Sequence, residues 1–241
     1  MTGLQIERLG EDALLLRLGK RIDPALNARV HALAAAIGAR RPRWLVDIVP
    51  AHASLALFVD VDMIDDADPH ARHPPLLQAE DWLRAQAFDV HAGEATLDDV
   101  EPALIPVRYG GAFGPDLDAL AAKAGMDAET AIALHAGGDY RVAMLGFAPG
   151  FPYLDGLDVR LAAPRRATPR VRVAAGSVGI GGAQTGIYPH QGPGGWNVIG
   201  RTPLRLFDPG REGPCLLAPG QRVRFRPIDD AEFERLAVQP A

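Results

Sequence analysis

The sequence contains little of what several common classes of protein require. Only one of its 241 residues is a cysteine, Cys215, so no disulfide can form within the chain, which is typical of a reducing compartment. The first residues lack the basic and apolar regions of a signal peptide, and we therefore expect a cytoplasmic protein. No apolar run approaches the roughly 18 residues that cross a bilayer, so we expect no membrane span.

Positive charge is also scarce over the chain as a whole. The formal net charge is -5, which argues against a protein that binds nucleic acid or a membrane surface with a broad basic face. The charge is uneven, however, because nine arginines stand against three acidic residues from Arg141 to Arg211, a local balance of +6. This stretch favours a small anionic substrate as the ligand.

Several catalytic motifs are incomplete or absent. The two lysines, Lys20 and Lys123, follow no G-x-x-x-x-G pattern, which excludes a P-loop. Residues 175–179 miss the G-x-S-x-G motif of serine hydrolases because the first glycine is replaced by alanine. The histidines of residues 70–73 have no further ligands at a useful spacing, so we expect no metal site. Cys215 lies in an apolar run without a neighbouring histidine, and we expect it to be a buried packing residue.

The first half of the chain has the pattern of a small α+β unit. Asp23 is placed to cap a helix that has Pro24 in its first turn and ends at Gly38. Strands are expected on both sides of this helix, and the segment 75–88 predicts a second helix. We expect strands at residues 4–9, 13–18, 44–49 and 54–60, an exposed loop at 60–75 and a linker at 89–102.

The second half predicts a β-rich domain. A strand at 104–109 is followed by two short helices divided at Gly125, with Asp127 placed to cap the second. After these we expect only short strands separated by glycine and proline, as in a β-barrel or sandwich. The fold class is therefore α+β, with an N-terminal domain at 1–95 and a barrel domain at 96–241. The expected short strands are 140–145, 171–173, 197–199, 204–207, 215–217 and 222–228.

Glycine is concentrated in one segment of the second half. Residues 146–202 contain 12 of the 26 glycines, about three times the usual frequency of roughly 7%. Glycine allows positive φ and lets backbone N–H groups converge on an anion. The same glycines would equally serve the tight turns of a small barrel, so both interpretations stay open.

The order of residues in this segment is more specific than its composition. It reads GFAPGFPYL at 146–154, AGSV at 175–178, QTGIYP at 184–189, PGGW at 193–196 and IGRTP at 199–203. In these motifs the chain resembles the allophanate hydrolase subunit 1 family, also described as carboxyltransferase subdomains C and D. The likeness extends more weakly over nearly the whole chain. Three positions depart from the family pattern: Gly192 where serine is usual, Ala174 where proline is usual and His52 where an aromatic residue is common.

The resemblance implies a fold and a function. It implies a small α/β domain followed by a cyclophilin-like barrel. The family includes subunits of ATP-dependent 5-oxoprolinases, which open 5-oxoproline to glutamate together with sister subunits C and A, so ATP would be shared with those partners. Two alternatives stay open: an inhibitor of a sensor histidine kinase like KipI, and a carboxyltransferase-like subunit that acts on another amide.

Three arginines are the first candidates for contact with an anionic ligand. Arg165, Arg170 and Arg201 flank the glycine and proline loops, where a guanidinium can bind a carboxylate or phosphate with two hydrogen bonds. We expect Arg165 and Arg170 to bind substrate and Arg201 to take part in catalysis. The alternative is that some of them are surface or subunit-contact residues, where ion pairs are weak.

Two further residues are candidates for proton transfer. His135 titrates near neutrality in its ordinary environment, and the Tyr140 phenol can donate a proton. His135 could instead end a helix, with its charge on the helix dipole, and Tyr140 could cap a barrel edge. The remaining candidates for substrate binding are Gln184, Thr185, Tyr188, Gly194, Gly195 and Trp196, the last as a wall or interface anchor.

Overall fold

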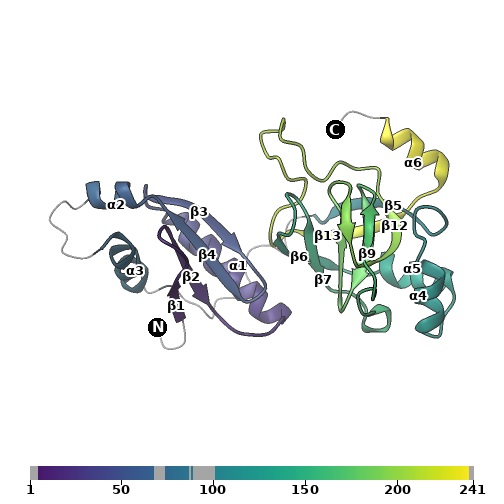
Figure 1. Ribbon diagram of the computed structural model, residues 1–241, viewed down its shortest axis with the longest axis horizontal. Coiled ribbons are helices and arrows are strands. Elements are labelled where there is room, and N and C mark those ends of the chain that lie inside the picture. Colours follow the sequence, from purple (N-terminus) through teal and green to yellow (C-terminus); the bar gives the residue numbers. More distant parts are fainter. Residues whose placement is uncertain (1–4, 68–73, 87, 89–100, 239–241) are drawn as a thin grey trace. The chain divides into compact units, whose positions relative to one another are not determined.

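The computed structural model describes residues 5–67, 74–86, 88 and 101–238 (Figure 1). The chain forms two compact units, Met1–Thr96 and Leu97–Ala241, and each is described by itself. The domain boundary expected after residue 95, and most of the expected linker, lie outside the described residues, so that boundary stays a prediction. Within the described ranges no helix combines the length and the apolar character that crossing a membrane requires.

The first unit is built on a four-stranded antiparallel sheet (Figure 1). Its strand order is β1 (Gln5–Arg8), β2 (Ala13–Arg17), β4 (Ser54–Val59) and β3 (Leu45–Pro50). Helix α1 (Pro24–Ala39) contacts β3 and β4, while α3 (Pro75–Ala85) contacts β2. The two helices and the sheet enclose one apolar core, to which they contribute Leu14, Leu16, Val30, Leu33, Ile37, Leu55, Leu57, Leu76, Ala79 and Leu83.

Local capping accounts for two of the helices in this unit. The Asp23 carboxylate accepts hydrogen bonds from the N–H groups of Ala25 and Leu26 at 2.9 and 3.2 Å, so the predicted start of α1 is confirmed. The loop expected at 60–75 is wrong for residues 61–67, which form α2 (Val61–Ala67). Asp60 accepts a hydrogen bond from the N–H of Met63 at 3.1 Å, and Ile64 is buried in the core, so a cap and an apolar anchor make this helix.

The second unit is a closed seven-stranded barrel flanked by helices. Around the barrel the order is β10 (Gln184–Ile187), β7 (Pro152–Asp155), β6 (Tyr140–Leu145), β13 (Arg222–Pro227), β5 (Ala103–Tyr109), β12 (Asn197–Arg201) and β9 (Ser177–Gly181). All neighbouring strands are antiparallel except β13 and β5, which are parallel. The α+β class with a barrel in the second half, as expected from the family resemblance, is confirmed.

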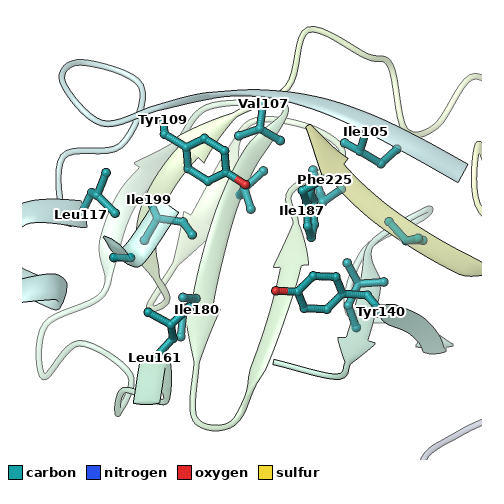
Figure 2. Packing of buried hydrophobic residues seen from close by; sticks show 14 of the residues in the cluster. Ile105, Val107, Tyr109, Leu117, Tyr140, Leu161, Ile180, Ile187, Ile199 and Phe225 are labelled. Atoms are coloured by element: carbon teal, nitrogen blue, oxygen red, sulfur yellow. The ribbon is translucent and has the colours of Figure 1, made fainter. Parts of the chain in front are cut away.

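The inside of the barrel is filled by side chains from its strands (Figure 2). Tyr109 and Tyr140 direct their rings into this core together with Ile187 and Phe225 (Figure 2). Helices α4 (Leu117–Lys123) and α5 (Ala128–Ala136) lie side by side against the barrel, and a 3-10 turn that follows β7, η1 (Val159–Leu161), contacts α5. As predicted, Asp127 caps α5, accepting a hydrogen bond from the N–H of Thr130 at 2.7 Å.

Three expectations for the end of the chain are wrong. A helix, α6 (Asp230–Ala237), follows the barrel, because the Asp229 carboxylate accepts a hydrogen bond from the N–H of Glu232 at 2.8 Å and starts it. The segments 204–207 and 215–217 are not strands and share only the isolated bridge between Phe207 and Cys215. Cys215 is half-buried instead of fully buried, since the bridge lies outside the barrel sheet.

Candidate functional site

The glycine-rich segment forms strands as well as turns. It supplies β7, β9, β10, β12 and β11 (Gly192–Gly194), which pairs with β8 (Arg170–Val173) in a two-stranded sheet. At Gly181 a Cβ atom would lie 2.6 Å from the indole ring of Trp196, so glycine is required for this ring to pack on the strand. Together with Gly179, where a Cβ atom would lie 3.2 Å from Trp196, this glycine serves close packing around the indole ring.

Four aromatic side chains form a cluster against this part of the barrel. The Phe151 ring centroid lies 5.3 Å from that of Tyr188 and 5.5 Å from that of Trp196, with the rings nearly perpendicular in both pairs. Tyr153 packs beside them, with its ring 5.7 Å from Trp196. The guanidinium carbon of Arg165 lies 5.9 Å from the Trp196 ring centroid, a cation–π distance. The Arg165 side chain is exposed, so it lies over the aromatic cluster and faces solvent.

A buried carboxylate fixes the neighbouring arginines. Asp116 accepts hydrogen bonds from Arg170 at 2.6 and 2.9 Å, from Arg166 at 2.8 Å and from the N–H of Val198 at 2.7 Å. Burial opposes the charge on Asp116, but the hydrogen bonds from Arg170 and Val198 outweigh it, and the pKa of this carboxyl is lowered. Asp116 therefore stays ionised and ties the segment that carries both arginines to the barrel. We call Asp116, Arg165, Arg166, Arg170, Tyr188 and Trp196 the arginine–aromatic patch.

Arg201 does not belong to this patch and lines a pocket of its own. The pocket has a volume of about 490 Å³, within the range of small-molecule sites. Besides Arg201, its polar side chains are His190, Thr202 and Arg205, and most of its wall is apolar. We call it the Arg201 pocket; its lining consists of Ala175, Gly176, Pro189, His190, Arg201, Thr202, Pro203, Leu204, Arg205, Phe207, Pro209, Phe233 and Ala237.

The backbone around Arg201 holds its side chain in place. The Nε–H of Arg201 donates a hydrogen bond to the carbonyl oxygen of Ala175 at 2.7 Å. Gly176 has a φ of 79°, and a Cβ atom there would overlap the carbonyl oxygen of Thr202. The two terminal nitrogens of the half-buried Arg201 make no hydrogen bond or ion pair within the described part of the chain. Its charge is therefore anchored at one edge and available for a ligand at the other.

His135 and Tyr140 lie in the core of the barrel. His135 has 0% exposed surface, and its Nδ1 and Nε2 atoms lie 2.8 Å from the Tyr109 hydroxyl and 3.0 Å from the Thr185 hydroxyl. The Tyr140 hydroxyl donates to the carbonyl oxygen of His135 at 2.8 Å. Burial lowers the pKa of His135 to about 3 and raises the pKa of Tyr140, so both stay neutral near pH 7. This burial favours a structural role for both, and their catalytic role stays a prediction.

The tautomer of His135 follows from the hydrogen-bond pattern. The Thr185 hydroxyl donates its one proton to the carbonyl oxygen of Gly179 at 3.1 Å, so it must accept from His135. Nε2 of His135 therefore carries the proton, and Nδ1 accepts the proton of Tyr109. A buried chain runs from Tyr109 through His135 and Thr185 to the backbone, and each member has its partner.

The other predicted binding residues divide among these places. Thr185 belongs to the buried chain of His135, and the Gln184 amide donates to Asp155 at 2.7 Å. The carbonyl oxygen of Gly195 accepts from the N–H of Arg166 at 2.7 Å, and Gly194 leaves room for the Tyr188 hydroxyl. Gly194, Gly195, Tyr188 and Trp196 therefore lie together with Arg165 and Arg170. The structure does not bring Gln184, Thr185 or Arg201 into that group.

Asp116 and His190 are two of the site residues that were not among the sequence candidates. Asp116 holds two arginines that follow it by 50 and 54 positions, a contact that no local pattern indicates. His190 lines the Arg201 pocket, and its place directly after QTGIYP was the only available signal. Within the described ranges no group of three or more histidine, cysteine, aspartate or glutamate side chains could hold a metal ion. The expected absence of a metal site stays a prediction.

Comparison with known proteins identifies the family. The model of the carboxyltransferase domain, subdomains C and D, matches residues 4–217, most of the chain. The chain belongs to this family. The residues matched to the carboxyltransferase subdomain C and D family include every strand of the first unit and every barrel strand except β13.

Relatives of similar length occur in bacteria. A Bacillus subtilis protein, named as the B subunit of 5-oxoprolinase, is 41% identical over 233 residues, 95% of each chain. One of Escherichia coli with the same name is 42% identical over 219 residues, 91% of this chain and 94% of the relative. The crystal structure of the protein TTHA0988 superposes with a TM-score of 0.73 at 37% identity over 90% of this chain. This chain spans about 40% of the length of TTHA0988.

Proposed function

We propose that the chain is the B subunit of an ATP-dependent 5-oxoprolinase and opens 5-oxoproline to glutamate only within a complex. The observation that carries this proposal is the identity of 41% and 42% to two proteins that are named as this component of 5-oxoprolinase, at near-equal length. Such a name implies further components. We propose sister subunits C and A as these partners, and the cytoplasm as the compartment, in line with a single cysteine in the chain.

The chemistry explains why one chain is not enough. The lactam is an amide whose resonance must be overcome, and ATP would supply the phosphoryl group that activates its oxygen. The residues of this chain do not fit a P-loop site for ATP, because neither Lys20 nor Lys123 follows the required glycines. We therefore assign ATP to a site completed by partner subunits.

The part that this chain takes is binding and orientation of the substrate. Arg201 presents to a pocket two terminal nitrogens that have no partner among the described residues, which suits a carboxylate. Arg165 lies over Trp196 on an exposed surface, which suits an interface with a partner subunit. Arg170 is held by Asp116, so we propose that it positions the patch and does not bind substrate directly. His135 and Tyr140 would act by supporting the barrel.

Reconstitution tests the proposal. The purified chain is mixed with its C and A partners, and glutamate formation from 5-oxoproline is measured together with ATP consumption. We expect both activities to need all three chains. Glutamate formation that does not depend on this chain would refute the assignment. Inhibition of a histidine kinase by this chain alone, with no effect on 5-oxoproline turnover, would favour the KipI-like alternative instead.

A further inference from the structure

We propose that the Arg201 pocket is the site that binds the carboxylate of a small organic monoanion. Its charge is the first argument. Arg166 and Arg170 share the buried carboxylate of Asp116, which offsets one of their two charges, and the exposed Arg205 is paired with Asp208 at 3.0 Å. Arg201 has no carboxylate partner within the described residues, and it is the half-buried arginine of the pocket.

The fixed geometry of Arg201 is the second argument. Because Nε donates to Ala175, the guanidinium plane is held and its Nη atoms remain to bind both oxygens of a carboxylate. The strand pairing of Arg201 with Ser177 and the hydrogen bond from the N–H of Thr202 to the carbonyl oxygen of Gly176, at 2.9 Å, hold the backbone on both sides. A pre-oriented cation loses less entropy when a ligand binds.

The wall of the pocket selects the rest of the ligand. Pro189, Pro203, Phe207 and Phe233 contribute apolar surface beside the cation. Such a wall suits a compact ring with few polar groups. A phosphate or a dianion fits less well, because several of its oxygens would be left there without hydrogen-bond partners. His190 is exposed at the pocket and can donate to a carbonyl group. A five-membered lactam with one carboxylate meets these conditions.

The identity of the ligand rests on the proposed function, whereas the existence of the site does not. 5-Oxoproline carries one carboxylate and one ring amide, which match the cation and the histidine of the pocket. The binding can be measured on the full chain without its partners, so that the test does not depend on turnover.

The test is titration of the ¹⁵N-labelled chain with 5-oxoproline, followed by amide chemical shifts in NMR spectra. We expect saturable shifts at Gly176, Arg201 and Thr202. Arg201→Gln should weaken binding by roughly tenfold or more, about 1.4 kcal/mol. Arg160→Gln is the matched control, because Arg160 is exposed, paired with Asp158 and outside the pocket, and it should bind as the unaltered chain does.

A second probe removes the charge of the ligand and leaves the protein unchanged. The methyl ester of 5-oxoproline lacks the carboxylate, and we expect it not to produce these shifts. The proposal is overturned if no saturable shift occurs at the pocket, if the ester binds as well as the acid, or if Arg201→Gln binds with unchanged affinity. A complex that fails to turn over 5-oxoproline, although the isolated chain binds it at Arg201, would overturn the proposed function and leave this site standing.

Discussion

The buried histidine makes the stability of the barrel unit depend on pH in a predictable way. His135 has a pKa of about 3 in the folded chain, lowered by burial from 6.5, which also stands for the unfolded chain. The unfolded state therefore binds a proton first as the pH falls, and the stability due to neutral His135 is present above pH 6.5 and lost progressively toward pH 3. Each pKa unit corresponds to about 1.4 kcal/mol. Between pH 7 and pH 5 the expected loss is about 2 kcal/mol.

Urea unfolding at a series of pH values measures this loss. The comparison is the variant His135→Gln, whose amide can also donate and accept but does not titrate. We expect the variant to be less stable at pH 7, and its free energy of unfolding to fall by about 2 kcal/mol less than that of the unaltered chain between pH 7 and pH 5. The difference between the two slopes isolates His135 from the carboxylates that titrate in both proteins.

A second measurement covers the case in which the variant does not fold. NMR titration of the His135 ring in the unaltered chain should show a neutral Nε2–H tautomer with no protonation down to about pH 4. Protonation of the ring near pH 6.5 in the folded chain, or equal pH slopes in the two proteins, would refute the reasoning from burial.

Three further predictions concern stability. Asp116→Asn should lower the free energy of unfolding, measured with urea, by about 3 kcal/mol, because two arginines lose a buried charged partner. Asp158→Asn is the control and should change this free energy little, because Asp158 belongs to an exposed ion pair. Gly176→Ala should lower the free energy of unfolding by at least about 2 kcal/mol, because the added Cβ meets a backbone oxygen. Gly182→Ala should lower it by about 1 kcal/mol, because Gly182 also has a positive φ but has open space around it. Tyr109→Phe should cost about 2 kcal/mol by leaving a buried ring nitrogen without its donor.

The elements that local chemistry determines were predictable from the sequence. Asp23 and Asp127 cap their helices through hydrogen bonds to residues two or three positions along the chain, so the motif itself contains the structure. Strands with an apolar core face, such as β6, have the bounds that their pattern predicts. The resemblance to the family added the barrel closure, which no local pattern specifies.

Helix α6 carries the same local signal, because the Asp229 carboxylate accepts a hydrogen bond from the N–H of Glu232 three positions along, and distant contacts add to it. Phe233 packs on Phe113 with ring centroids 4.6 Å apart, and Asp230 is bound by Arg108 at 2.5 Å, more than a hundred positions earlier. No residue of α6 is fully buried. The cap and the many helix-forming residues of α6 were therefore readable from the sequence, and the distant contacts stabilise a helix that is short for an isolated one.

In the candidate site, the sequence could not show which arginine is available to a ligand. Arg170 and Arg201 are the same residue type, both half-buried and both beside glycine-rich loops, and no local pattern separates them. Their partners separate them: Arg170 binds a carboxylate 54 positions away, whereas Arg201, within the described part of the chain, binds only a backbone carbonyl. A charge that is already neutralised inside the fold has little left for a ligand. The local excess of positive charge therefore overstates the charge available for binding, and Arg201 is the better candidate because no described carboxylate neutralises it.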